Sequence, residues 1–205
     1  MWGKGKFYRS KLIKKLLIFL LFFTTYSQKL ISSPKEDILA NFALINNLSF
    51  EFKQQIGEKI ERGSCQIEYP KLMYCLYEND NRKEIISNGR TLVIKNNRYN
   101  KTYFYRLKKT PLNYILDKKY IIEEIKNLEP QVTDNGNIKF SVTREDDSFI
   151  FFFNSKTFDL VGWKTIDIYQ NVVIFEINNV QKNIDIDKKL FKLPAVNYRI
   201  FYLII

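Results

Sequence analysis

The sequence contains no histidine, and its 205 residues include only two cysteines and seven glycines. Without histidine the chain cannot form a Ser-His-Asp triad, a histidine-ligated metal site or a histidine proton relay. Two cysteines cannot supply a four-cysteine zinc site or a disulfide-rich small fold. Seven glycines leave little material for phosphate-binding loops. We therefore expect no metal, no cofactor and no enzymatic activity.

The residues that are present have the composition of a folded chain, with 45% hydrophobic, 16% aromatic and 27% charged positions. The formal net charge of +11 is unevenly distributed, because six Lys and Arg residues lie within residues 1–27 and the first acidic residue is Glu36. The rest of the chain has 27 basic and 22 acidic residues, a net charge of +5. This small excess does not favour nucleic acid as a partner.

Residues 1–27 have the pattern of a secretory signal peptide. A basic beginning precedes the apolar run Leu16–Phe23, and Thr25 and Ser27 occupy the −3 and −1 positions of a cleavage site before Gln28. The uncharged stretch from Leu16 to Gln28 has 13 residues, which is short for a membrane span. An uncleaved anchor in the inner membrane is the alternative. We predict a signal peptide over residues 1–27 and a single domain over residues 28–205, located outside the cytoplasm.

The first structural signal of the mature chain is Ser33-Pro34-Lys35-Glu36. Ser33 suits the N-cap of a helix, Pro34 suits the first helical position, and Glu36 can complete a capping box. Apolar residues at helical spacing follow, at Ile38, Phe42 and Ile45. These features predict an amphipathic helix of three or four turns.

From Leu48 the spacing of apolar residues changes to two, which is typical of a strand with one buried face. Phe50, Phe52, Gln54 and Ile56 share that face. The further predicted strands are Ser64–Tyr69, Leu72–Tyr77, Lys83–Ser87, Thr91–Lys95, Lys101–Leu107, Asn137–Thr143, Ser148–Asn154, Val161–Tyr169 and Asn171–Asn178. Because short turns join them, neighbouring strands must be antiparallel.

Between the two groups of strands, Thr110-Pro111 predicts the start of a second short helix. Tyr120–Leu128 fits either a helix or a strand. With so few helices to cover a sheet that is rich in Phe and Tyr, the sequence predicts a curved antiparallel sheet with a small helical lid. Such a sheet has room for enclosed apolar volume. The apolar end of the chain, Ile200–Ile205, is interpreted as a terminal edge strand.

The order of several short motifs resembles the LolA family of periplasmic lipoprotein carriers, in particular its alphaproteobacterial members. The resemblance covers the chain from Pro34 to Pro194. It rests on Phe50-Glu51-Phe52-Lys53-Gln54, Gly63 before Tyr69-Pro70, Ile85 to Arg90, Asn97–Asn100, Thr110-Pro111-Leu112, Leu160 with Trp163 and Asp167, Asn183-Ile184-Asp185, Leu190-Phe191 and Leu193-Pro194.

The resemblance implies an incomplete antiparallel barrel closed by short helices over an apolar cavity. It implies a monomeric periplasmic chaperone that binds the acyl chains of lipoproteins. Such a carrier receives lipoproteins from an ATP-driven exporter in the inner membrane and delivers them to a receptor in the outer membrane. The alternative is a periplasmic module of the same fold that binds a lipid or protein signal without transporting it.

The resemblance also suggests which residues form the site, although core packing is the alternative for each aromatic residue taken alone. The expected acyl-chain cavity consists of Phe42, Phe50, Phe52, Tyr74, Leu112, Ile115, Leu116, Phe149, Phe151, Phe153 and Phe175. The residues expected to close the lid are Tyr69, Pro70, Thr110 and Pro111. Family members commonly have an arginine where Tyr69 stands, so we expect closure to be held differently in this chain.

The two cysteines lie symmetrically about Pro70, at positions 65 and 75. If Tyr69-Pro70-Lys71 is the turn of a hairpin, Cys65 and Cys75 face each other across it. The sequence is compatible with a disulfide, which an oxidising compartment would favour, and with two buried thiols.

Overall fold

The computed structural model describes residues 33–78, 82–144, 147–167 and 170–195. The predicted signal peptide and the apolar end of the chain therefore lie outside the described residues. None of the helices in these ranges combines the length and the apolar character that crossing a membrane requires.

Helix α2 (Pro34–Ala43) opens the described chain and has the predicted capping box. The Ser33 hydroxyl accepts a hydrogen bond from the Glu36 backbone N–H, and the Glu36 carboxylate accepts one from the Ser33 N–H. Ile38 and Phe42 form its buried side. The start of the helix is therefore fixed by local sequence, as predicted.

Eleven strands among the described residues form one antiparallel sheet that is not closed into a barrel. Their bounds are β1 Asn47–Ile56, β2 Lys59–Glu68, β3 Leu72–Tyr77, β4 Lys83–Asn88, β5 Thr91–Asn96, β6 Lys101–Arg106, β7 Gln131–Val132, β8 Ile138–Arg144, β9 Asp147–Phe153, β10 Leu160–Ile166 and β11 Val172–Lys182. The predicted fold class, a curved antiparallel sheet with a helical lid, is confirmed.

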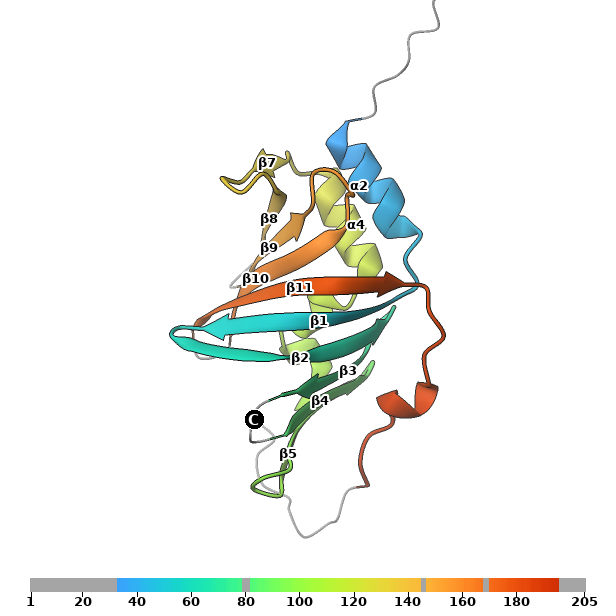
Figure 1. Ribbon diagram of the computed structural model, residues 1–205, viewed down its shortest axis with the longest axis vertical. Coiled ribbons are helices and arrows are strands. Elements are labelled where there is room, and N and C mark those ends of the chain that lie inside the picture. The colour runs from blue at the N-terminus through green and yellow to red at the C-terminus, as the bar shows by residue number, and fades with distance from the viewer. Residues whose placement is uncertain (1–32, 79–81, 145–146, 168–169, 196–205) are drawn as a thin grey trace, which may run out of the picture. The chain divides into compact units, whose positions relative to one another are not determined.

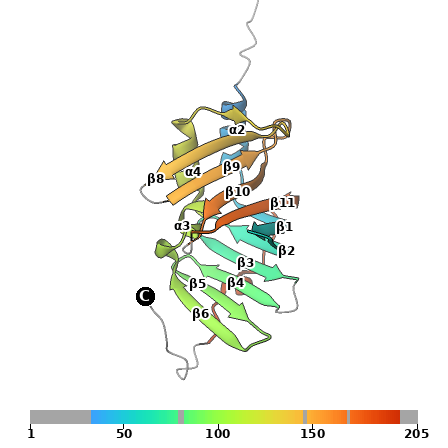
Figure 2. The ribbon, with the colours of Figure 1, turned by 90° about the vertical axis from the view of Figure 1, so that its left-hand side faces the viewer.

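The sheet consists of two meanders that are joined at their middle. Its order is β6-β5-β4-β3-β2-β1-β11-β10-β9-β8-β7, so the first strand pairs with the last. In Figure 2 the lower half of the sheet runs from β1 to β6 and the upper half from β11 to β8. Strands β6 and β7 are the two edges of the sheet within the described residues.

The helical segment between β6 and β7 covers one face of this sheet (Figures 1 and 2). It comprises the 3-10 turn η1 (Leu107–Lys109), the single-turn helix α3 (Leu112–Ile115) and helix α4 (Lys118–Lys126). Figure 1 shows α4 lying beside α2 next to strands β8–β10. The segment Tyr120–Leu128, for which helix and strand both remained open, is therefore mostly helical.

Two irregularities bend the sheet around the covered face. The pairing of β1 with β11 shifts between Ser49 and Glu51, and the pairing of β10 with β9 shifts between Leu160 and Gly162. A bulge of this kind bends a strand and increases its twist. At Gly162 a β-carbon would lie 2.2 Å from the carbonyl oxygen of Phe175, so only glycine allows this close approach of β10 and β11.

Several boundaries differ from those predicted from the sequence. Strand β2 begins at Lys59 rather than Ser64, and β11 continues to Lys182 rather than Asn178. The two-residue strand β7 and the 3-10 turn η2 (Lys188–Phe191) were not predicted, because neither has a periodic apolar pattern.

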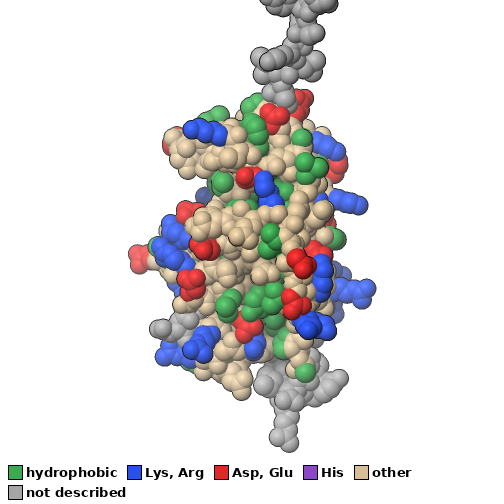
Figure 3. Space-filling model, turned by 45° about the vertical axis from the view of Figure 1, so that its right-hand side comes forward, with side chains coloured by type: hydrophobic (Ala, Val, Ile, Leu, Met, Phe, Trp, Pro, Cys, Tyr) green, Lys and Arg blue, Asp and Glu red, His purple; other side chains and the backbone are tan. Residues whose placement is uncertain are grey.

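On the molecular face in Figure 3, basic and acidic side chains lie interspersed among smaller groups of hydrophobic ones.

Candidate functional site

A cavity of about 270 Å³ lies between the covered face of the sheet and helix α3, and it is partly open to solvent. Its walls come from β1 to β5, from the end of β6, from β10 and β11, and from the start of the lid. The lining residues are Phe50, Gln54, Ile56, Cys65, Ile67, Met73, Cys75, Tyr77, Ile85, Leu92, Ile94, Tyr105, Thr110, Pro111, Leu112, Ile115, Trp163, Thr165, Asp167, Val173 and Phe175. Most of these side chains are apolar, so the cavity suits a hydrocarbon ligand.

The lid side of the cavity is built by the short segment that follows β6. The N–H and the hydroxyl of Thr110 both donate to the carbonyl of Leu107, each at 2.9 Å, and Pro111 is the N-cap of α3. The single turn of α3 then brings Leu112 and Ile115 to the cavity wall. The predicted second helix is therefore present and faces the cavity.

Stacked aromatic rings form the wall on the side of β10 and β11. The Trp163 ring lies parallel to that of Phe175, with centroids 4.3 Å apart, and Phe50 meets Phe175 edge to face at 6.4 Å. The bulge at Gly162 immediately precedes Trp163 in the sequence. These rings give the cavity a rigid apolar wall.

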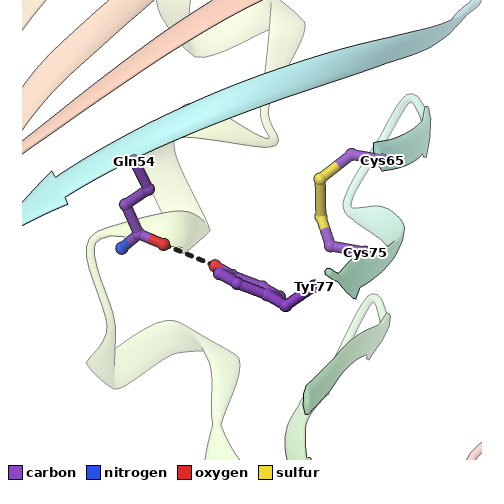
Figure 4. The surroundings of a disulfide bond; sticks show 4 residues. All are labelled: Gln54, Cys65, Cys75 and Tyr77. Carbon is purple, nitrogen blue, oxygen red and sulfur yellow. Dashed lines mark hydrogen bonds between the residues drawn. A yellow bond between two sulfur atoms is a disulfide. The ribbon is translucent and has the colours of Figure 1, made fainter. Parts of the chain in front are cut away.

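The structure joins Cys65 of β2 and Cys75 of β3 in a disulfide whose Cα atoms are 4.1 Å apart (Figure 4). The two residues are direct partners in the antiparallel register of the hairpin, and Tyr69-Pro70-Lys71 connects its strands. Both cysteines line the cavity. The cross-link therefore belongs to the wall of the site.

The wall becomes polar beyond the disulfide, on the side away from the β2–β3 turn. The hydroxyl of Tyr77 donates to Oε1 of Gln54 at 2.6 Å, and both residues line the cavity (Figure 4). Gly63 lies between Phe52 and Tyr77 in the register, and a β-carbon there would lie 2.8 Å from the Phe52 ring. Glycine thus leaves room for the Phe52 and Tyr77 rings to meet at 4.8 Å.

A buried carboxylate stands next to this polar wall. Glu61 is only 5% exposed and forms ion pairs with Lys83 at 2.7 Å and Lys59 at 3.2 Å. Burial by itself would raise the pKa of Glu61, but the hydrogen bonds and charges of the two lysines hold it below its ordinary value. Burial also lowers the pKa of Lys83, against the effect of Glu61. The Lys83 ammonium lies 3.7 Å from the centre of the Tyr77 ring and helps to fix it.

The turn of the disulfide hairpin is attached to the lid through Lys71. Its N–H donates to the carbonyl of Leu116 at 2.9 Å, and its ammonium lies 3.3 Å from the carboxylate of Asp117. Leu116 ends α3 and Asp117 is the N-cap of α4. Lys71 therefore connects the sheet to the point where the two lid helices meet.

The structure brings some of the predicted cavity residues together and places the others elsewhere. Phe50, Leu112, Ile115 and Phe175 line the cavity. The remaining apolar ones lie in the adjoining hydrophobic core, namely Phe42, Phe52, Leu116, Phe149, Phe151 and Phe153. Phe149, Phe151 and Phe153 of β9 are fully buried there, and the ring of Phe153 meets that of Phe42 of α2 edge to face, with centroids 6.0 Å apart.

Tyr74 differs from the other predicted cavity residues because it points to the opposite face of β3. Met73 and Cys75 on either side of it line the cavity, and side chains alternate along a strand. Tyr74 is accordingly only partly buried.

Of the four residues predicted to close the lid, two line the cavity and two lie elsewhere. Thr110 and Pro111 line the cavity. Tyr69 instead packs its ring edge to face against Phe42 of α2, with centroids 5.9 Å apart, and Pro70 is exposed. The position two residues after the tyrosine, Lys71, supplies the charged contact to the lid.

Sequence reasoning overlooked Gln54, Tyr77 and Lys71 as site residues. The alternation in β1 does place Gln54 on the same face as Phe50, but a glutamine is not expected in an apolar wall. Lys71 has a φ of 68°, a conformation usual for glycine or asparagine, so nothing in its residue type signalled the contact. Within the described part of the chain, no group of acidic residues and cysteines is arranged to hold a metal ion.

Comparison with known proteins identifies one family. The family described as outer membrane lipoprotein carrier protein LolA matches residues 43–194. A comparison with curated protein sequences finds no match.

Solved structures with a similar fold share very little sequence with this chain. An uncharacterised conserved protein from Thermus thermophilus has a TM-score of 0.48 and 8% identity, over 78% of this chain and 92% of that one. A LolA superfamily protein from Nitrosomonas europaea has a TM-score of 0.41 and 10% identity, over 79% and 99%. LprF from Mycobacterium bovis has a TM-score of 0.42 and 11% identity, over 76% and 94%.

Proposed function

Because the chain belongs to the LolA family of outer membrane lipoprotein carrier proteins, we propose that it carries lipoproteins by enclosing their acyl chains in the cavity under α3. The observation that supports this proposal is the apolar lining of a partly open cavity whose lid is a single helical turn. Carriage requires binding and release, and we assign no catalytic step to the protein.

The energetics of such a site follow from the burial of methylene groups. Each methylene removed from water contributes about 0.8 kcal/mol, so acyl chains are held strongly against release into water. A membrane offers nearly the same gain per methylene. Extraction from one membrane therefore has to be driven, whereas delivery to another can be close to balanced.

We propose that the lid moves when cargo enters. The cavity volume of about 270 Å³ lies below the range of about 300–1,000 Å³ that is usual for small-molecule pockets, so several acyl chains of about 15 methylenes each would not fit in it together. In our proposal α3 swings away from the sheet, and the contacts of Lys71 with Leu116 and Asp117 are the ones that open.

The proposal places the protein in the periplasm as a monomer. Its partners there are an ATP-driven exporter in the inner membrane, which loads it, and a receptor in the outer membrane, which unloads it.

The proposal is tested by placing a charge in the cavity where the fold tolerates it. Ile94 lines the cavity and is only partly buried, whereas Ile60 is 48% exposed and does not line it. We expect Ile94→Glu to weaken binding of a triacylated lipopeptide at least tenfold, because entering chains would desolvate the new carboxylate. Ile60→Glu is the matched control and should bind like the wild type. Binding is measured by titration calorimetry of the mature protein.

Two results would contradict the proposal. One is a folded, monodisperse wild-type protein that binds no acylated peptide, which would favour a module that binds a protein signal. The other is unchanged binding in Ile94→Glu, which would place the acyl chains outside this cavity.

A further inference from the structure

The polar part of the cavity wall offers a hydrogen-bond donor to whatever enters the cavity. Gln54 lines the cavity between Phe50 and Ile56 along the same face of β1. Its Oε1 accepts the Tyr77 hydroxyl at 2.6 Å, whereas its Nε2 group has no acceptor among the described residues. In Figure 4 the amide nitrogen points away from Tyr77.

Tyr77, which binds one end of the Gln54 amide, is held in place by its surroundings. It is 4% exposed, packs against Phe52, and has the Lys83 ammonium over its ring. Burial, reinforced by the negative charge of Glu61, raises the pKa of Tyr77, so its hydroxyl stays protonated. That hydroxyl donates to Oε1 of Gln54, which leaves both N–H groups of the amide for a ligand.

The charges nearby favour a neutral acceptor over an anion. The charged residue in the cavity lining is the acid Asp167, whereas Lys83 and Lys59 lie outside the lining and both pair with Glu61. A hydrocarbon chain that displaces water from Gln54 would leave its N–H groups unsatisfied. A ligand with an acceptor at the end of its apolar part avoids that cost.

We propose that Gln54, oriented by Tyr77, binds the acyl carbonyl of the cargo, whether ester or amide, and thereby sets how deeply each chain enters the cavity. Gln54 is the binding residue and Tyr77 its positioning residue. This inference rests on the proposed function, because it requires acyl chains in this cavity. The same carbonyl chemistry occurs in acylated lipoproteins and in membrane phospholipids, so the test includes both sources.

The test compares ester-linked ligands with ether-linked analogues of the same chain length. The first pair is a diacylglyceryl lipopeptide and its dialkyl ether form, and the second is a phosphatidylglycerol and its ether form. One hydrogen bond corresponds to a preference of about fivefold for the ester in the wild type. In Gln54→Leu we expect the two forms to bind equally, because the variant has no amide N–H groups that only the ester can satisfy. A preference for the ester of the lipopeptide alone identifies lipoprotein as the source, and a preference in both pairs makes it general to acyl lipids.

The matched control is Gln55→Leu, on the same strand. Gln55 donates to the carbonyl of Gly57 at 3.1 Å and does not line the cavity, so the ester preference should persist. Tyr77→Phe leaves the Gln54 amide free to rotate and should reduce the preference for the ester. A purely structural role of Tyr77 would weaken both forms together.

The outcomes separate this inference from the function on which it rests. If the wild type binds neither form, the carrier proposal fails and the inference fails with it. If the wild type binds ester and ether equally, or Gln54→Leu keeps the preference, only the inference is overturned. If Gln54→Leu does not fold, the infrared carbonyl band of an isotope-labelled ester bound to the wild type decides. A shift to lower wavenumber supports the inference, and a band at the position found in alkane overturns it.

Discussion

At the scale of single residues, a buried ionised group lies beside the apolar cavity wall. The Glu61 carboxylate shares the covered face of β2 with Cys65 and Ile67, since the three alternate along the strand, but of these only Cys65 and Ile67 line the cavity. Two lysines maintain its charge there. The apolar wall is therefore bordered by a charged cluster.

This cluster leads to a prediction for acid stability. The folded-state pKa of Glu61 is below its ordinary value of 4.5, so its ionised form contributes stability above that pH and loses it as the pH falls through the folded value. We expect Glu61→Gln to be less stable than the wild type at neutral pH, because Lys83 loses its buried partner. The variant should also lose less stability on acidification. Urea unfolding at a series of pH values measures both effects.

The control for acid stability is Asp159→Asn. Asp159 also has a lowered pKa, because its bonds to Lys182, Asn41 and Thr157 outweigh the opposite effect of burial. It lies in the turn before β10, away from the cavity wall, so the two variants should remove separate parts of the acid dependence. A Glu61→Gln profile parallel to that of the wild type would show that folding does not shift the pKa of Glu61.

At the scale of elements, the lid is held by a few polar contacts. Helix α3 is one turn long, and Lys71 connects the hairpin turn to its end. The ion pair of Lys71 and Asp117 is partly exposed, with 29% and 27% of the two side chains accessible. Such a pair contributes about 0.2–1 kcal/mol, which suits the opening of the lid that we propose.

We therefore expect Lys71→Met to loosen the lid without unfolding the sheet. The substitution keeps the aliphatic stem and the backbone hydrogen bond to Leu116 and removes only the charge. Loss of up to 1 kcal/mol corresponds to an increase of about two- to fivefold in the open population. Hydrogen exchange of the α3 amides measures this increase. Lys119→Met, at an exposed position of α4, is the control, and equal exchange in both variants would contradict the role of Lys71.

Elements were easier to predict from the sequence than the cavity. The capping box at Ser33 and the alternation in β1 determine their own structures locally, so α2 and most strands were predicted within a few residues. Alternation shows which face a side chain shares but not what covers that face. Phe50 faces the cavity and Phe151 the packed core, although both belong to apolar strand faces. That difference depends on where α2, α3 and α4 lie across the sheet.

At the scale of the whole molecule, the disulfide links β2 and β3, two adjacent strands of the half of the sheet that runs from β1 to β6. It closes a short loop, since the two cysteines are 10 positions apart in the sequence. By loop entropy, such a cross-link stabilises the fold by about 2–3 kcal/mol. We expect the double variant Cys65→Ala, Cys75→Ala to keep its fold but to have a free energy of unfolding lower by that amount. Urea unfolding measures the difference.

Reduction of the wild type provides the control for this variant. Reduced protein loses the cross-link but keeps the sulfur atoms in the cavity wall. If the double variant loses more unfolding free energy than the reduced wild type does, the difference measures lost packing. Identical stability of the oxidised and reduced wild type would show that the cross-link does not restrict the unfolded chain.

The two edges that the sheet has within the described residues bear on how many kinds of cargo the proposed carrier would accommodate. In a closed barrel, the radius is set by the number of strands and by their shear. Here β6 and β7 end the sheet within the described residues, so no closing hydrogen bonds fix a circumference. The width between the two meanders can then vary by bending at the bulges near Ser49 and Gly162, without breaking the strand pairs. Internal diameter becomes an elastic property of the sheet, and in the proposed carrier ligands with two or three acyl chains would share one scaffold.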